Sequence, residues 1–175
     1  MKGANGTGST GRVHVLDLFT ETIYTRATGK FIQNERGTIY MLGDKIGEGR
    51  GQTTGQRVLP SENGMPQVET SFQSTDVVLG VETANMATYH AVARPDGTLF
   101  GEGQGVLMGK NGEMASWVGH GIGRFTGPGG ASSFRGAVYY QSASPAWARL
   151  NGAVGVYEHE TDAQGKTHTQ YWEWK

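Results

Sequence analysis

Hydrophobic and polar residues alternate with a period of two along most of the chain, which is the spacing of a β-strand. The clearest run is TLFGEGQGVLMGKNGEMASWVGHGIGRF, from Thr98 to Phe125, where glycine recurs at alternate positions on both sides of Asn111-Gly112. Asn-Gly favours a tight two-residue turn, because both central residues of a type I′ turn need positive φ. The stretch therefore predicts a β-hairpin within a curved sheet.

Further strands are predicted on both sides of this hairpin. Pro95-Asp96-Gly97 is a second tight-turn signal, and the run from Lys30 to Leu42 reads as a small hairpin or lid. One short helix is expected from Ser144 to Gly152, since serine caps helices and proline fits their first position. The remaining predicted strands are Arg12–Arg26, Gln67–Glu82, Asn85–Arg94, Phe134–Gln141, Ala153–Glu160 and Thr167–Trp174.

About eight to nine strands joined mostly by hairpins, with no long helical period, predict an all-β fold. The expected architecture is a single antiparallel up-and-down β-barrel of the lipocalin-like kind with one short helix. The start of the chain is rich in Gly, Ser, Thr and Asn, so residues 1–11 are expected to be a flexible leader. Residues 12–175 would then form one barrel domain.

Composition narrows the possible functions. The net charge of −1 gives no electrostatic reason to expect nucleic acid or an anionic membrane as partner. The chain has no cysteine, which excludes disulfides and thiolate chemistry. It shows no signal-peptide core and no apolar run of membrane-spanning length, so a cytoplasmic protein is expected. No cofactor motif is recognisable, and the glycines lie within strands rather than before a phosphate-binding helix.

The two tight turns predict which residues share a face of the sheet. If Lys110 opposes Glu113, one face carries Tyr89, Glu102, Gln104 and Trp117, with Phe100, Val106 and Met108. The other carries His90, Leu99, Leu107, Val118, His120 and Ile122, around glycines 101, 103 and 105. The first face is interpreted as the barrel interior, because its large side chains sit opposite glycine or alanine. The alternative is that the glycines point inward and hollow out a cavity, leaving Glu102 and Gln104 in solvent.

The preferred interior would hold candidate catalytic groups. Glu48 in IGEGRGQ and Glu102 in FGEGQGV lie in similar glycine-lined strands. A buried carboxylate has a raised pKa, which suits a general acid or base. Tyr89 or Tyr140 would donate a hydrogen bond. Gln104, Trp117, Tyr157 and Trp172 would complete a pocket for an apolar ligand. Glutamates on the outer wall and plain core aromatics are the alternative reading.

His90 and His120 are the candidates on the alternative face. Both register against Gly103, so their backbones would lie roughly 9–10 Å apart. A shared metal ion would need a third ligand that the sequence does not supply, and no metal-binding motif is present. A surface or interface pair is therefore the preferred interpretation, and no metal is expected.

The segment from Gly101 to Gly136 resembles the late strands of the allene oxide cyclase and dirigent barrels. In those families a hairpin leads to a Gly-x-Gly-x-Phe-like run and then to another glycine-marked strand. Here GHGIGRF, from Gly119 to Phe125, followed by Gly127, fills that place. The resemblance implies an eight-stranded barrel, in dimers or trimers, that cyclises or couples reactive hydrophobic intermediates. The polar cavity motif and cysteine of the plant cyclase have no counterpart, so no catalytic residue is carried over.

Two main functions are consistent with these observations. One is a cofactor-free cyclase or isomerase that folds a small hydrophobic substrate inside the barrel, assisted by Glu102 or Glu48. The other is a non-catalytic lipocalin-like protein that binds a small apolar ligand. A closed barrel without a cavity, acting through an oligomer interface, is a third possibility. A homodimer or homotrimer is expected from the resemblance and from apolar residues on the presumed outer face.

Overall fold

A computed structural model of the chain describes residues 25–26, 29–33, 39–62 and 64–174. The predicted leader and most of the predicted strand from Arg12 to Arg26 lie outside these residues. The elements are β1 (Thr25–Arg26), β2 (Gly29–Gln33), β3 (Ile39–Met41), β4 (Lys45–Glu62), β5 (Met65–Val78), β6 (Val81–Ala93), β7 (Leu99–Gly109), β8 (Met114–Phe125), β9 (Ser132–Ser142), the 3₁₀ helix η1 (Pro145–Gly152), β10 (Gly155–Thr161) and β11 (Lys166–Glu173).

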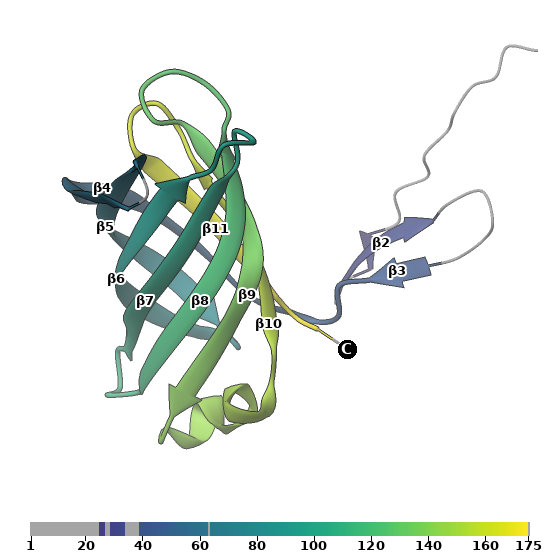
Figure 1. The fold of residues 1–175 in the computed structure, drawn as a ribbon. Helices are drawn as coiled ribbons and strands as arrows, with labels where there is room; N and C mark the ends of the chain where they lie inside the picture. Colours follow the sequence, from purple (N-terminus) through teal and green to yellow (C-terminus); the bar gives the residue numbers. More distant parts are fainter. Residues whose placement is uncertain (1–24, 27–28, 34–38, 63, 175) are drawn as a thin grey trace, which may run out of the picture.

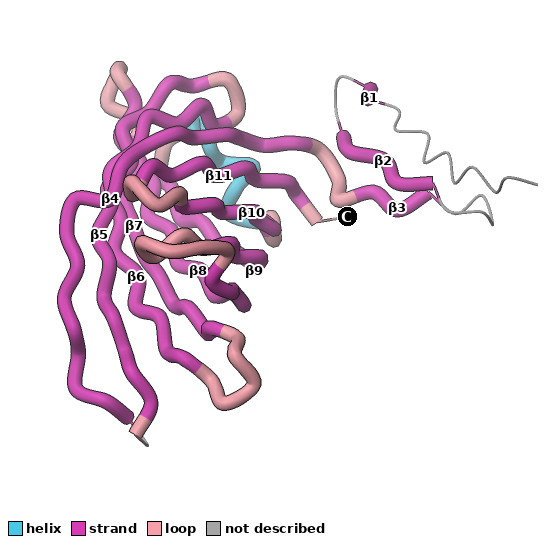
Figure 2. The backbone as a smooth tube through the Cα atoms, turned by 90° about the horizontal axis from the view of Figure 1, so that it is seen from above, coloured by secondary structure: helices cyan, strands magenta, loops and turns pink. Residues whose placement is uncertain are grey.

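Eight strands close into an antiparallel barrel in the order β10-β11-β4-β5-β6-β7-β8-β9. Every strand pairs with its neighbour in sequence, and β11 closes the ring by pairing with β4 (Figures 1 and 2). The predicted all-β barrel and its short helix are thus confirmed. The barrel begins at Lys45, because β1, β2 and β3 form a separate three-stranded sheet. Within that sheet, β2 and β3 make the hairpin predicted from Lys30 to Leu42.

The hairpin turns differ from the prediction by one residue. The Gly109 N–H donates to the Glu113 carbonyl at 2.8 Å, and the Gly112 N–H donates to the Gly109 carbonyl at 3.2 Å. Gly112 has φ +91°, whereas Asn111 has no positive φ. This is a three-residue loop with glycine at a left-handed position, rather than a two-residue type I′ turn. The loop around Gly97 repeats the same pattern of hydrogen bonds.

The extra loop residue reverses the predicted face of β7. Met108 pairs with Met114 and Gly103 with both Tyr89 and Gly119, so Gln104 is one position away from its predicted partners. A one-residue slip exchanges the two faces of a strand. Leu99 and Leu107 therefore point into the core, where they are buried, and Val106 and Met108 face outward. The prediction that Phe100, Val106 and Met108 line the interior was wrong.

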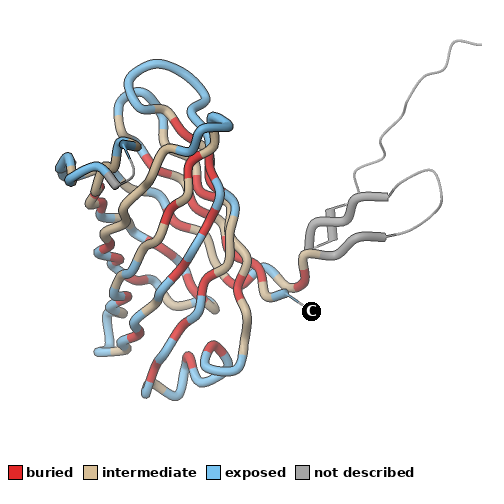
Figure 3. Tube along the Cα trace, viewed as in Figure 1, coloured by how far each residue is buried: buried red, intermediate tan, exposed pale blue. Residues whose placement is uncertain are grey.

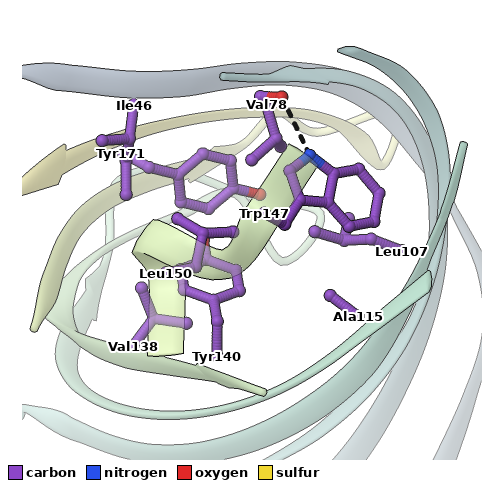
Figure 4. Packing of buried hydrophobic residues seen from close by; sticks show 9 residues of the cluster. All are labelled: Ile46, Val78, Leu107, Ala115, Val138, Tyr140, Trp147, Leu150 and Tyr171. Carbon is purple, nitrogen blue, oxygen red and sulfur yellow. Dashed lines mark hydrogen bonds between the residues drawn. The ribbon is translucent and has the colours of Figure 1, made fainter. Parts of the chain in front are cut away.

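One end of the barrel is filled by η1. Trp147 and Leu150 are fully buried, and the Trp147 indole N–H donates to the Val78 carbonyl at 3.3 Å. Around them pack Ile46, Val78, Leu107, Ala115, Val138, Tyr140 and Tyr171, which come from most of the barrel strands (Figure 4). Alternating buried and exposed positions run along the wall strands in Figure 3. This cluster closes that end of the barrel and leaves a space next to it in the barrel interior.

Candidate functional site: the central cavity

A cavity lies in the interior next to the η1 cluster. Part of its wall on β7 and β8 is bare backbone, at Gly101, Gly103 and Gly119. Aromatic and other side chains from the surrounding strands complete the lining: Phe72, Tyr89, Trp117, Phe134, Val138, Tyr157, His159, Thr169 and Tyr171. The inward glycines thus make room for rings that other strands contribute. This matches the alternative interpretation of the hairpin and not the preferred one.

The cavity is small. The cavity volume is about 60 Å³. A water molecule needs about 10–15 Å³ of such space, and ligand sites for drug-sized molecules measure about 300–1,000 Å³. The cavity therefore suits a molecule of several non-hydrogen atoms in this conformation.

A layer of four rings borders the cavity on the side away from η1. His159 lies with its ring centroid 5.3 Å from that of Phe72 and 6.1 Å from that of Tyr89. Phe134 packs edge-on against Tyr89 with centroids 6.0 Å apart. Edge-to-face contacts of this kind stabilise a defined arrangement of rings. The layer gives the cavity a second, mostly apolar boundary.

His159 is the most perturbed titratable group in this layer. It is buried, and burial lowers the pKa of its imidazole to about 4. Its Nδ1 lies 2.8 Å from the Thr169 hydroxyl and its Nε2 lies 3.3 Å from the Thr161 hydroxyl. Two neutral hydroxyl partners cannot compensate a buried positive charge, so the ring is neutral at neutral pH. His159 was not among the site residues predicted from the sequence.

Tyr157 offers an unused hydrogen-bonding group to the cavity. Its hydroxyl lies over Gly121, where a Cβ atom would come within 2.3 Å of it. Burial raises the pKa of Tyr157 to about 12, so the hydroxyl keeps its proton. Within the described part of the chain, no hydrogen bond to this hydroxyl is formed. It can donate one to a molecule in the cavity.

A buried polar cluster holds the rings on the η1 side of the cavity. The Trp117 indole N–H donates to Asn85 Oδ1 at 3.1 Å, and Asn85 Nδ2 lies 3.4 Å from Asp76 Oδ2. The Tyr171 hydroxyl donates to the same Asp76 oxygen at 3.0 Å, and the Ser74 hydroxyl donates to Oδ1 at 2.5 Å. Asp76 is completely buried, and desolvation raises the pKa of its carboxyl despite these donors. The cluster fixes the polar edges of two cavity rings.

Asp76 occupies the space that Gly49 leaves free. A Cβ atom at Gly49 would lie 2.0 Å from Asp76 Oδ1. This accounts for Gly49 in IGEGRGQ, the stretch in which Glu48 was the predicted acidic group. The acidic group inside the barrel is the one opposite the glycine. An isolated Asp on a strand gives no sequence signal for this placement.

The predicted site residues divide between the two sides of the wall. Tyr89, Trp117 and Tyr157 line the cavity, as predicted. Tyr140 is buried in the η1 cluster, and burial raises its pKa well above the ordinary range. Trp172 is buried but does not line the cavity, because a bulge between Tyr171 and Trp172 interrupts the strand and Tyr171 takes the inward position.

Glu102 and Gln104 lie on the outer wall, so their predicted inward placement was wrong. Glu102 Oε2 lies 3.2 Å from His90 Nε2, and Oε1 lies 3.1 Å from His120 Nε2. The two histidines predicted for the alternative face are therefore outside as well. With the correct register, Glu102 lies between them on the neighbouring strand. No group of three such side chains in the described part of the chain is arranged to hold a metal ion.

Glu48 also lies outside, on β4. Lys45 Nζ lies 2.5 Å from its Oε2, and His168 Nε2 lies 2.8 Å from Oε1. These two partners, Lys45 first, lower the pKa of Glu48 to about 2. A carboxylate held ionised on the outer wall does not have the raised pKa that the acid–base hypothesis needs. The prediction of a buried, raised-pKa Glu48 was wrong.

Comparisons with known proteins support the fold. No family model matches the chain, and no curated protein matches its sequence. A solved structure of a protein with unknown function from Clostridium acetobutylicum ATCC 824 is similar, with a TM-score of 0.65 and 9% identity. The match covers 75% of this chain and 98% of that chain. A conserved protein of unknown function from Rhodopseudomonas palustris has a TM-score of 0.61 and 10% identity, over 73% and 95% of the two chains.

At these identities the likeness concerns the fold alone. The neighbours share the closed eight-stranded antiparallel barrel. Among the described residues, no helix is both long and apolar enough to span a membrane.

Proposed function

We propose that the barrel is a binding protein for a small, neutral, mostly apolar ligand that carries one hydrogen-bond acceptor. The supporting observation is the chemistry of the cavity lining. Its titratable groups are kept neutral by burial, since the pKa of His159 falls to about 4 and that of Tyr157 rises to about 12. A lining without charge has nothing to pair with an ionic ligand, which would pay the full cost of desolvation.

Glycine backbones and aromatic rings supply the rest of the contact surface. Both favour flat, apolar molecules. The free hydroxyl of Tyr157 supplies a single directional contact, which would orient the ligand. This is the second function expected from the sequence, a lipocalin-like protein that binds a small apolar ligand without converting it.

A pair of isosteric probes tests the proposal. Cyclopentanone has an apolar ring and one acceptor oxygen, and methylenecyclopentane has nearly the same shape without an acceptor. We expect both to bind the wild-type cavity, with cyclopentanone tighter. The Tyr157→Phe variant should weaken cyclopentanone binding about three- to tenfold, the value of one net hydrogen bond, and leave methylenecyclopentane unchanged. Titrations followed by NMR shifts or by Trp117 fluorescence measure this.

The matched control is Tyr139→Phe. Tyr139 lies on the outer wall of β9 and is 47% exposed, so it loses the same hydroxyl at a place remote from the cavity. Its affinity for both probes should equal that of the wild type. Absence of binding of either probe to the wild-type protein would contradict the proposal.

We propose a cofactor-free isomerase or cyclase as the second candidate function, because one observation favours it. Tyr171 lines the cavity and its hydroxyl bonds to Asp76, a buried carboxyl of raised pKa. When the Asp76 carboxyl is protonated, it can donate to the Tyr171 oxygen, and the tyrosine O–H is then free to donate to an enol-like oxygen in the cavity. Glu102 and Glu48 cannot take this role across the wall.

The two candidates differ in the fate of the ligand. A molecule that co-purifies with the protein is incubated with fresh protein and analysed by mass spectrometry and NMR. Recovery of the same molecule supports binding alone. Conversion to an isomer that the Tyr171→Phe variant still binds but no longer produces supports the second candidate.

A further inference from the structure

We infer that the outer wall of the barrel carries a binding site, formed by Arg94 and Arg124, for a carboxylate attached to an apolar group. The site lies where β6 ends, β7 begins and β8 ends, at the end of the barrel away from η1, which is the upper end in Figure 1. It is on the outside of the wall and separate from the cavity, so the inference does not depend on the ligand proposed for the interior.

Arg94 and Arg124 differ from the other arginines of the barrel. The chain from Lys45 to Glu173 contains six arginines. Arg94 and Arg124 are exposed, and neither forms an ion pair within the described part of the chain. The other four all form ion pairs with carboxylates: Arg50, Arg57, Arg135 and Arg149. An exposed guanidinium without a carboxylate of its own is available to one from another molecule.

A neighbouring row on the same wall shows how such a site is filled. His90, Glu102 and His120 occupy paired positions on β6, β7 and β8. Glu102 Oε2 lies 3.2 Å from His90 Nε2, and Glu102 Oε1 lies 3.1 Å from His120 Nε2. One carboxylate on the middle strand is therefore shared by side chains from the strands on both sides.

The row that contains the two arginines has the same spacing but no carboxylate in its middle position. The Arg94 N–H donates to the Thr98 carbonyl at 2.8 Å. The first pair of the β7–β8 ladder, Leu99 with Gly123, brings Thr98 beside the other arginine, Arg124. The two arginine backbones are two strands apart, which is about 10 Å, so both long side chains can reach one carboxylate between them. A threonine supplies no such group, and the middle position is open to a carboxylate from another molecule.

Asp96, in the loop between β6 and β7, does not fill this position. Its Oδ1 accepts from the Thr98 N–H at 2.9 Å and from the Thr98 hydroxyl at 2.7 Å. The pKa of Asp96 is lowered first by these Thr98 donors and to a smaller extent by Arg94. The Asp96 carboxylate therefore stabilises the loop. Because a guanidinium has several N–H donors, Arg94 can bind a further carboxylate.

An apolar row beside the arginines indicates the other part of the ligand. Phe100 pairs with Val92 on β6 and with Ile122 on β8. Ile122 is 42% exposed, and the Arg94 guanidinium lies 4.9 Å from the centre of the Phe100 ring. A molecule whose carboxylate lies between the arginines would place the neighbouring atoms on Phe100 and Ile122. The site therefore favours an apolar carboxylate over a bare anion.

Three probes test the inference with the full-length protein: 3-phenylpropionate, its neutral amide 3-phenylpropanamide, and acetate. NMR titrations follow the backbone signals of Thr98 and Ile122, and the indole signal of Trp117 reports on the cavity. We expect 3-phenylpropionate to shift the Thr98 and Ile122 signals with a dissociation constant in the millimolar range. The constants of the amide and of acetate should be at least about threefold higher, since one lacks the charge and the other the apolar group. Equal affinity for 3-phenylpropionate and its amide would overturn the inference.

Removal of either arginine should weaken the binding. Arg94→Gln and Arg124→Gln should each raise the dissociation constant of 3-phenylpropionate about threefold, and the double variant about tenfold. The matched control is Arg57→Gln, because Arg57 is also exposed but already lies 3.0 Å from Glu69. It should leave the constant unchanged. Circular dichroism establishes that the variants are folded.

A second pair of variants keeps both arginines. Thr98→Glu places a carboxylate in the middle of the arginine row, as Glu102 does in its own row, and should abolish the binding of 3-phenylpropionate. Thr98→Gln has nearly the same size without the charge and should bind within about twofold of the wild type. Binding that persists in Thr98→Glu, or that the arginine variants leave unchanged, contradicts the proposed site.

Discussion

The inner and outer faces of β7 alternate along the same eleven residues, yet they carry different kinds of side chain. The middle of the inner face is Gly101, Gly103 and Gly105, against which Phe134, Tyr89 and Trp117 pack, and Leu99 and Leu107 flank these glycines. The outer face is Phe100, Glu102, Gln104, Val106 and Met108, with exposed apolar groups around one paired carboxylate. Backbone is needed inside because the rings come from other strands. The side chains of the strand itself are free for contacts outside.

From this difference between the faces, we expect a methyl group added on the inner face to lower the free energy of unfolding. The same group should be tolerated where a strand faces open space. A Cβ atom at Gly136 would lie 2.0 Å from the His120 carbonyl oxygen and 2.7 Å from the Gly121 Cα, both backbone atoms. Gly136→Ala should therefore lower the free energy of unfolding by about 3 kcal/mol. Gly55→Ala on β4 has nothing within 4 Å and should change it by less than about 0.5 kcal/mol.

Denaturant titration followed by circular dichroism measures both variants. The difference between them is the quantity of interest, because each exchanges the same two residue types. Equal stability of the two variants would mean that the β8–β9 backbones can separate without cost, which contradicts the close-packed inner face.

A smaller change in folding stability is expected from pH. His159 on the inner face and Glu48 on the outer face should contribute to it in different pH ranges. The folded-state pKa of His159 is lowered to about 4, whereas an unfolded histidine has a pKa of about 6.5. The unfolded chain therefore binds the proton first, and stability falls as the pH decreases from about 6.5 towards 4. Between about pH 7 and pH 5 the loss should be about 2 kcal/mol. The His159→Gln variant should lose most of this dependence in urea titrations at the two pH values.

At lower pH, the stability of the fold should depend on Glu48 on the outer wall. The pKa of Glu48 is lowered to about 2, so its contribution is present above the unfolded value of 4.5 and is lost as the pH falls towards 2. Its side chain is 35% exposed, so screening by solvent makes this contribution weaker than that of His159. We expect added salt to diminish the loss of stability that Glu48 causes at low pH. The loss that His159 causes should not change with salt. Thermal melts of wild type and Glu48→Gln at low and high salt measure the effect.

Strand alternation and turn residues were sufficient to predict the barrel, because each local signal agreed with the same closed sheet. The helix from Ser144 to Gly152 was predicted from its proline and glycine, and it appears as η1. Ser144 makes no side-chain cap there. Its hydroxyl accepts from the Met114 N–H at 3.0 Å instead, which joins η1 to the start of β8.

The site was harder to predict because it depends on single-residue register. Asn111-Gly112 is compatible with a two-residue and a three-residue loop, and the choice exchanged Glu102 with Gly103 at the cavity wall. Tyr89, Trp117 and Tyr157 were placed correctly because their strands are aromatic on one parity only. Asp76 and Asn85 were missed because their partners, Tyr171 and Trp117, come from distant strands and no local pattern links them.

The smallest expected effect concerns the two glutamates that the sequence favoured. In the double variant Glu48→Gln, Glu102→Gln, both carboxylates become amides on the outer wall, where they contact Lys45, His168, His90 and His120 and not the cavity. The affinity for cyclopentanone at neutral pH should therefore stay within about twofold of the wild type, since no cavity contact changes. The same NMR titration measures it, with Tyr157→Phe as the positive control. A tenfold loss in the double variant would mean that the ligand sits against the outer wall. The inner face would then be only hydrophobic core, and the outer face would be the one that contacts the ligand.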